Sequence, residues 1–221
     1  MRRLALAAAL ALSSIAEPAA AQVVAGVDLG SLAGESAAAA AAAMSTFAGL
    51  VTEANVSRMG FPDVGAVRRA RVGVPFADFM VDLPRLAAFR AGTDPVSLLR
   101  PTQMVVYPLQ ATGGGQSSIT LAHREGGWVA VSFGSPARTD ALVRTREEMA
   151  RRQEGRLGSY FQVRVAPLNL LFVGHLNGTE LTLTPAFGAA EYGLASGRTV
   201  AASAIFARLS EVAARDRGGF R

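Results

Sequence analysis

The sequence predicts an α+β protein in which an antiparallel β-sheet built from hairpins packs against several helices and follows an N-terminal helical arm. Two observations support this prediction. Short glycine-rich linkers join β-like runs, as in hairpins. Segments with apolar residues at helical spacing stand apart from those runs. We divide the chain into a signal peptide, the arm, the α+β domain and a disordered tail, at 1–21, 22–58, 59–216 and 217–221.

The start of the chain has the pattern of a cleavable secretory signal peptide. Two arginines follow Met1, an apolar run extends from Leu4 to Leu12, and small residues lead up to Ala21 before Gln22. We therefore expect cleavage at or near Ala21 and a bacterial protein that is periplasmic or secreted. After the signal no stretch of about 18 apolar residues occurs without polar interruption, so no transmembrane segment is expected.

The segment 35–55 is predicted to be helical because Met44, Phe47 and Val51 recur at helical spacing, and Ser36 is available as its N-cap. The alanine run within it favours a helix but offers little surface to bury. We expect an arm that packs loosely on the main domain. Its apolar stripe, Met44, Phe47 and Val51, is a candidate partner-binding surface.

The first part of the domain predicts a β-like run followed by a three-stranded meander. The run covers 72–81, and Asp82 is the expected N-cap of a short helix that closes near Gly92. Three further strands lie close together along the chain, with glycine-rich linkers of hairpin length between them. These strands are expected at 103–110, 117–124 and 127–133.

The second part of the domain predicts a hairpin flanked by helices. Asn177-Gly178 is the dipeptide that a type I′ turn requires, and it separates two β-like runs. Ser135-Pro136 is a suitable start for the preceding helix, and Ile205 and Leu209 belong to the apolar stripe of a closing helix. The expected elements are a helix at 135–155, strands at 160–165, 169–176 and 179–184, and a helix at 199–214.

Composition excludes several classes of function. The chain has no cysteine, which rules out disulfides, thiolate metal sites and a cysteine nucleophile. Without Arg2, Arg3 and Glu17, the 22 basic and 17 acidic residues of the chain fall to 20 and 16, a net charge of +4. Nucleic-acid binding requires basic residues concentrated on one face. Because acidic residues are interleaved with the densest arginine cluster, we expect no nucleic-acid partner.

The two histidines, His123 and His175, are candidate binding residues, and one of them would be the base of any hydrolase built on this chain. Neither has a second histidine at ligand spacing, so we expect no metal site and no cofactor. No GxSxG motif occurs, and Pro136 after Ser135 removes the backbone N–H that helps to form an oxyanion hole. Catalytic residues therefore stay unassigned.

Tyr107 and Trp128 are further candidate binding residues, which we place in adjacent predicted strands. Their rings would form part of an exposed platform for a peptide or another ligand, since aromatic residues are enriched at interfaces. The alternative is packing in the core, where large aromatic side chains are mostly found.

Four short strings occur in order along the chain: Met59-Gly60-Phe61, Gly73-Val74-Pro75, Tyr107-Pro108 and the stretch GWVAVSFG at 127–134. Through them the chain resembles, over Met59 to Arg144, exported bacterial proteins of unknown function. The resemblance implies a small secreted α+β domain and supplies no catalytic residues.

The expected function is that of an exported, non-enzymatic protein that binds a protein, a peptide or an envelope component through its sheet or its N-terminal helix. Two alternatives stay open. One is a periplasmic hydrolase of unfamiliar type that uses His123 or His175, which requires these imidazoles, or one of them and a carboxylate, to meet in a pocket. The other is a carrier of an apolar small ligand, which requires a large apolar cavity. The oligomeric state is open as well.

Overall fold

The structure, a computed structural model, describes residues 22–112, 114–153 and 155–216. Within these residues a mixed sheet of nine strands forms the centre of the molecule, in the order β11-β10-β9-β8-β4-β5-β6-β7, with β3 paired beside β4 on β5. The predicted signal peptide at 1–21 and tail at 217–221 lie outside the described residues. The α+β class is confirmed.

The strands of the sheet are β3 (Arg71–Val72), β4 (Phe76–Met80), β5 (Arg100–Gln110), β6 (Gln116–Arg124), β7 (Gly127–Phe133), β8 (Tyr160–Val165), β9 (Leu170–Asn177), β10 (Glu180–Phe187) and β11 (Val200–Ala201). A separate hairpin joins β1 (Val23–Val24) and β2 (Val27–Asp28). The α-helices are α1 (Leu29–Leu50), α2 (Val64–Arg69), α3 (Leu83–Ala87), α4 (Pro136–Gln153) and α5 (Ala202–Asp216), and short 3-10 turns include η1 (Pro95–Leu98) and η3 (Ala166–Leu168).

The sheet is mixed because its two central strands, β4 and β8, run parallel, with Asp78 opposite Gln162. This corrects the prediction of a purely antiparallel sheet. Hairpin linkers reveal pairing only between strands that are close in sequence, whereas β4 and β8 are brought together by the whole β5–β7 meander and α4. That meander is confirmed, and so is the pairing of β9 with β10, although their turn is shifted by one residue.

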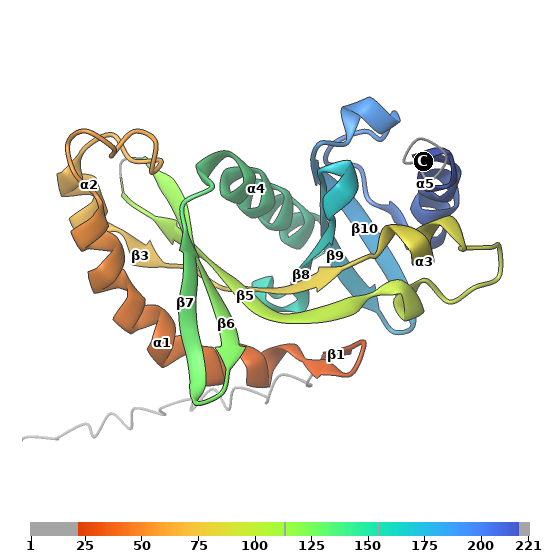
Figure 1. Ribbon diagram of the computed structural model, residues 1–221, viewed down its shortest axis with the longest axis horizontal. Coiled ribbons are helices and arrows are strands. Elements are labelled where there is room, and N and C mark those ends of the chain that lie inside the picture. Colours follow the sequence, from red (N-terminus) through yellow and green to blue (C-terminus); the bar gives the residue numbers. More distant parts are fainter. Residues whose placement is uncertain (1–21, 113, 154, 217–221) are drawn as a thin grey trace, which may run out of the picture.

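The two halves of the sheet repeat one order of pairing. In each half a helix precedes a central strand, and three antiparallel strands then follow outward: α1 with β4, β5, β6 and β7, and α4 with β8, β9, β10 and β11. Helix α1 covers β5–β7 on one face, whereas α4 crosses the opposite face over β6, β9 and β10 (Figure 1). This arrangement corresponds to an approximate twofold axis parallel to the central strand pair.

Alternation along the strands assigns the apolar side chains to the two faces. On β8, Phe161 and Val163 pack with α3 and α5, while Tyr160 packs on the α4 side. On β4 and β5 the opposed residues Phe76 and Val106 both join the α4 side. Helices α1, α3 and α5 therefore share one face, and α4 covers only part of the other.

Helix α1 begins earlier than the sequence predicts. Its N-cap is Asp28, whose carboxylate accepts hydrogen bonds from the backbone N–H groups of Gly30 and Ser31 at 2.9 and 3.1 Å. Ser36 is therefore not the N-cap; it lies inside the helix, fully buried. Glycines in the first turns lower helix propensity and hid this start from the sequence pattern.

Helix α1 is part of the core. Phe47 is fully buried, with its ring centroid 5.9 Å from those of both Phe61 and Phe133. Ala40 and Ala43 are also buried, because their small side chains allow the helix to approach the sheet closely. The alanine run thus supports packing, and α1 does not lie loosely on the domain.

The β9–β10 turn differs by one residue from the predicted geometry. Asn177 pairs with Glu180, so the two central residues are Gly178 and Thr179 instead of Asn177 and Gly178. Gly178 has φ 59°, and it occupies the first central position as in a type II′ turn. Glycine at the first central position suffices to fix the hairpin register.

Gly60 offers a direct test of how the α1 segment is joined to the sheet. Its φ is +87°, its carbonyl accepts the Gln116 N–H at 2.8 Å, and an added Cβ would lie 2.0 Å from the Gln116 carbonyl oxygen. We expect Gly60→Ala to lower the free energy of unfolding by at least about 2 kcal/mol, measured by urea denaturation. The matched control is Gly49→Ala in α1, where a Cβ meets nothing within 4 Å and the change is expected to be neutral or stabilising. Equal effects of the two substitutions would contradict the conclusion that the close contact with Gln116 requires glycine at position 60.

Candidate functional site

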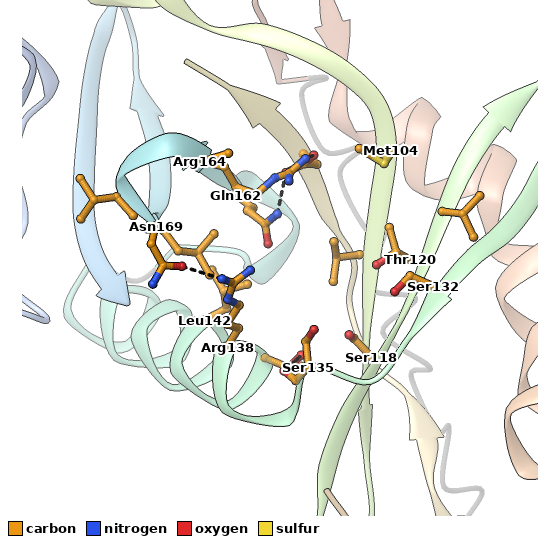
Figure 2. A pocket seen from close by; sticks show the side chains of 17 residues that line it. Met104, Ser118, Thr120, Ser132, Ser135, Arg138, Leu142, Gln162, Arg164 and Asn169 are labelled. Atoms are coloured by element: carbon orange, nitrogen blue, oxygen red, sulfur yellow. Dashed lines mark hydrogen bonds and ion pairs between the residues drawn. The ribbon is translucent and has the colours of Figure 1, made fainter. Parts of the chain in front are cut away.

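A polar cavity of about 320 Å³ lies on the α4 face of the sheet. We name it the α4 cavity. Its walls are the first turns of α4, the outer strands β6 and β7, and the β8–β9 connection with η3, as Figure 2 shows. The polar side chains that line it are Asp78, Ser118, Thr120, Ser132, Ser135, Arg138, Thr139, Gln162, Arg164 and Asn169.

The centre of the sheet contributes a buried ion pair to this cavity. Asp78 on β4 is buried, with 1% of its side chain exposed, and the Arg164 guanidinium on β8 donates to both of its oxygens, from Nε at 2.8 Å and Nη2 at 2.5 Å. Gln162 Nε2 donates at 2.5 Å and Thr102 Oγ1 at 2.7 Å to the same carboxylate. The hydrogen bond to Asp78 raises the pKa of Arg164. The carboxylate of Asp78 is thus fully occupied.

Gln162 leaves one acceptor unused. The residue is 5% exposed and its amide nitrogen is bonded to Asp78. Its oxygen Oε1 has no hydrogen-bond partner among the described residues, and in Figure 2 it points to the side of the cavity where Arg138 lies. An amide oxygen that lines a cavity without a protein partner is free to accept a hydrogen bond, so this atom favours a ligand that donates an N–H or O–H.

Arg138 supplies charge at the mouth of the cavity. Its Nη2 donates to Asn169 Oδ1 at 2.6 Å, and its guanidinium carbon lies 5.5 Å from the centroid of the Phe187 ring. Asn169 adopts the left-handed conformation that ends η3, φ 52°, and so turns its side chain toward α4. No carboxylate within the described ranges pairs with Arg138. Because Asp78 balances only Arg164, the cavity carries one positive charge in excess.

The start of α4 completes the wall. Gly134 and Ser135 both have positive φ, 110° and 62°, and this pair turns the chain out of β7 into the helix. The hydroxyl groups of Ser118 and Thr139 bond to the carbonyls of Gly134 and Ser135 and hold this turn. No histidine lines the α4 cavity, so Ser135 has no imidazole beside it to act as a base.

Arg146 fixes α4 against the sheet at its other end. Its guanidinium stacks on Phe76 at 3.8 Å and donates from Nη1 to the carbonyls of Val74 and Pro75 at 2.8 and 3.2 Å. Burial lowers the pKa of Arg146 to about 10, so the side chain stays charged at neutral pH. This anchor is structural and lies outside the cavity.

The two histidines do not converge. His123 on β6 stacks edge-on against Trp128, with ring centroids 5.2 Å apart, and His175 on β9 stacks on Tyr160 at 4.8 Å. Strands β6 and β9 are four positions apart in the sheet, which corresponds to about 19 Å at the usual strand spacing. A hydrolase that uses both imidazoles together is therefore incompatible with this fold.

Burial of His175 makes stability depend on pH. Desolvation lowers the pKa of His175 below its usual value of 6.5. The unfolded chain then binds a proton at a higher pH than the folded protein, so stability is lost as the pH falls below 6.5. We expect the melting temperature of the wild type to fall more between pH 7.5 and 5 than that of His175→Gln, measured by calorimetry. The same pH dependence in both proteins would contradict a half-buried His175 with a lowered pKa.

Tyr107 and Trp128 lie on strands that are separated by β6, so they are not in adjacent strands as predicted. Tyr107 is buried under α1, where its hydroxyl bonds to Ser36 Oγ at 2.8 Å and donates to the Ala33 carbonyl at 3.0 Å. Burial raises the pKa of Tyr107. Tyr107 thus belongs to the core. Trp128 is half-buried beside the same helix.

A second cavity, of about 280 Å³, lies on the opposite face beside the start of α1. It is lined by His123, Trp128 and Glu35, and Asp78 and Met104 line both cavities from the sheet between them. The indole Nε1 of Trp128 is buried without a hydrogen-bond partner among the described residues. No hydrogen bond joins His123 to Glu35, so these two residues do not form a catalytic dyad in this structure.

The predicted partner-binding stripe faces inward. Phe47 and Val51 are buried and Met44 is half-buried, all three packed in the cluster between α1 and the sheet. The stripe is therefore occupied within the molecule and is not available to a partner while α1 is docked.

The outer edge of β7 is the long unpaired edge of the sheet. The strand has seven residues, GWVAVSF, without a charge or a proline, and Val129 and Val131 are each 45% exposed. The opposite edge, β11, has only two residues. Natural edge strands are usually shortened, charged or covered to prevent pairing. The edge at β7 is neither short nor charged, and its one irregularity is a register shift between Ala130 and Ser132.

Comparison with protein-family models, curated proteins and solved structures finds no match. Within the described part of the chain no helix is both long enough and apolar enough to cross a membrane, and no three histidine, aspartate or glutamate side chains gather as metal ligands. The arguments below therefore rest on the geometry of this chain.

Proposed function

We propose that the chain is an exported binding protein that adds an extended peptide to the free edge of β7. Export is proposed from the signal pattern in 1–21. In strand addition the peptide supplies backbone hydrogen bonds to an open edge, and neighbouring pockets read its side chains. The observation that carries the proposal is an uncharged seven-residue edge strand beside a polar cavity.

A peptide fits this edge better than a second copy of the chain. Val131 and Ser132 of β7 line the α4 cavity, so a strand added at this edge passes a hollow with one excess positive charge. An acidic peptide complements that charge. A second copy would place its own Arg138 near the same edge, which like-charge repulsion disfavours.

The alternatives receive less support from the site. A hydrolase lacks a base hydrogen-bonded to a nucleophile, because the histidines lie apart and neither lines the α4 cavity. An apolar carrier requires a large apolar cavity, whereas the α4 cavity is polar and the second cavity is close to the lower limit of about 300 Å³ for ligand pockets.

The test uses a displayed library of random ten-residue peptides with free C-termini, selected on the purified protein. Enriched peptides are synthesised, and their Kd is measured by fluorescence polarisation. We expect N-methylation of the peptide backbone to weaken binding at every second residue, by about fivefold for each lost hydrogen bond. We also expect Val129→Asp on β7 to weaken binding at least about tenfold, because a charged edge residue opposes pairing.

The matched control is Val23→Asp, which changes an exposed valine (54%) on the β1–β2 hairpin. It should leave the Kd unchanged. The proposal fails when no peptide is enriched, when binders ignore Val129→Asp, or when N-methylation has no periodic effect. It also fails when light scattering shows a dimer that Val129→Asp dissociates, since the edge then serves a second copy.

A further inference from the structure

We propose that the α4 cavity is a subsite for a carboxylate group carried next to a backbone amide, as at the C-terminus or at an acidic residue of a peptide. This inference rests on the proposed function and deepens it, because it names the chemistry that the bound peptide presents. It is carried by three features of the cavity: an excess positive charge, an unpartnered acceptor on the buried residue Gln162, and a set of hydroxyl groups.

Arg138 is the donor for the carboxylate. Only Nη2 of Arg138 donates a hydrogen bond within the described residues, to Asn169, so its other N–H groups remain available to a ligand in the cavity. Arg164, by contrast, is held by two bonds to Asp78. Because Asn169 and the Phe187 ring orient the guanidinium, Arg138 is prepared to donate to a carboxylate without large rearrangement.

Gln162 Oε1 distinguishes a peptide carboxylate from a simple anion. The Gln162 residue is 5% exposed, and its Oε1 has no partner among the described residues and accepts only from a donor. Acetate has no donor and would leave it unsatisfied, and the negative charge of acetate or of phosphate would be repelled by it. The backbone amide N–H of the residue that carries the carboxylate satisfies it. The hydroxyl groups of Thr120, Ser132 and Ser135 then face the rest of the ligand.

The position of the cavity agrees with the edge-strand proposal. Strand β7 passes directly into Gly134 and Ser135, and Ser132 and Ser135 both line the cavity. A peptide along the outer edge of β7 therefore reaches the cavity at the C-terminal end of that strand. Its volume of about 320 Å³ suits a single residue and not a long segment.

The experiment is an NMR titration of the purified ¹⁵N-labelled protein with small probes. N-acetylglycine mimics a C-terminus, N-acetylaspartate N-methylamide mimics an internal acidic residue, and N-acetylglycinamide lacks the carboxylate. Acetate and inorganic phosphate supply the charge without the amide. We expect the carboxylate probes with an amide to shift the Arg138 side-chain signal and the backbone signals of residues 132–139. We also expect them to bind at least about fivefold more tightly than acetate.

Arg138→Gln is expected to weaken binding of these probes about tenfold or more, because it removes charge-assisted hydrogen bonds. The matched control is Arg144→Gln on the same helix, where Arg144 pairs with Asp140 on an exposed surface. It should leave the affinity unchanged. Comparing N-acetylglycine with the aspartate derivative tells which source of carboxylate the site takes.

Four results overturn the inference: no shift at Arg138, equal binding of N-acetylglycinamide, equal or tighter binding of phosphate, or an unchanged affinity in Arg138→Gln. The two proposals fail in different ways. Library peptides that require the β7 edge but ignore Arg138→Gln overturn the subsite and keep the strand addition. Binding of N-acetylglycine at Arg138, together with no edge-dependent peptide, keeps a small carboxylate site and overturns the strand addition.

Discussion

Replacing Arg164 with alanine is expected to lower the free energy of unfolding by about 3–5 kcal/mol. The substitution leaves the Asp78 carboxylate buried at the centre of the sheet, with only Gln162 and Thr102 as side-chain donors. Removing one partner of a buried ion pair costs this much because the other charge stays desolvated. Urea denaturation followed by circular dichroism measures the loss.

Two further variants separate the buried pair from ion pairs in general. Arg100→Ala removes the exposed partner of Asp82, a pair at 3.1 Å, and is expected to cost less than about 1 kcal/mol. The double variant Asp78→Leu with Arg164→Met removes both charges and should be more stable than Arg164→Ala alone. A cost for Arg164→Ala no larger than that for Arg100→Ala would show that the pair does not hold β4 to β8.

The sequence predicts those parts of the fold that depend on local signals. The hairpins follow from glycines and alternating apolar residues, α4 from its Ser135-Pro136 start, and α5 from helical periodicity. The parallel pairing of β4 with β8 has no local signal, because it depends on which strands remain to be paired after the two meanders form. The start of α1 was missed since Gly30 and Gly34 weaken the helical pattern that Asp28 begins.

The candidate site is harder to predict because its residues come from distant parts of the chain. The signal that was available is a charge inside an apolar strand: Asp78 within Phe76–Met80 and Arg164 within Tyr160–Val165. A buried charge needs a partner of opposite charge, so two strands that each contain one buried charge are expected to pair with each other. Arg138 carries no such signal, since arginines on a surface helix are common. The sequence patterns favoured aromatic residues and histidines instead, and the structure places Tyr107 in the hydrophobic core.

Replacing Phe47 with alanine is expected to lower the free energy of unfolding by about 3–5 kcal/mol, which distinguishes an integral α1 from a loosely packed arm. The side chain is fully buried between Phe61 and Phe133, so its removal leaves a cavity between the helix and β7. Trp128 is the only tryptophan of the chain and packs in the same cluster. Its fluorescence therefore reports on the docking of α1.

In urea denaturation of Phe47→Ala, we expect the Trp128 fluorescence and the circular dichroism to change together at a lower midpoint with an unchanged slope, as in two-state unfolding. Leu50→Ala is the matched control, because Leu50 lies on the same helix with 49% of its surface exposed, and it should change stability by less than about 0.5 kcal/mol. Fluorescence that changes before the circular dichroism, with a small total loss, would mean that α1 undocks separately. The inward-facing stripe of Met44, Phe47 and Val51 would then become accessible, and a partner that binds α1 would compete with the sheet for the same residues.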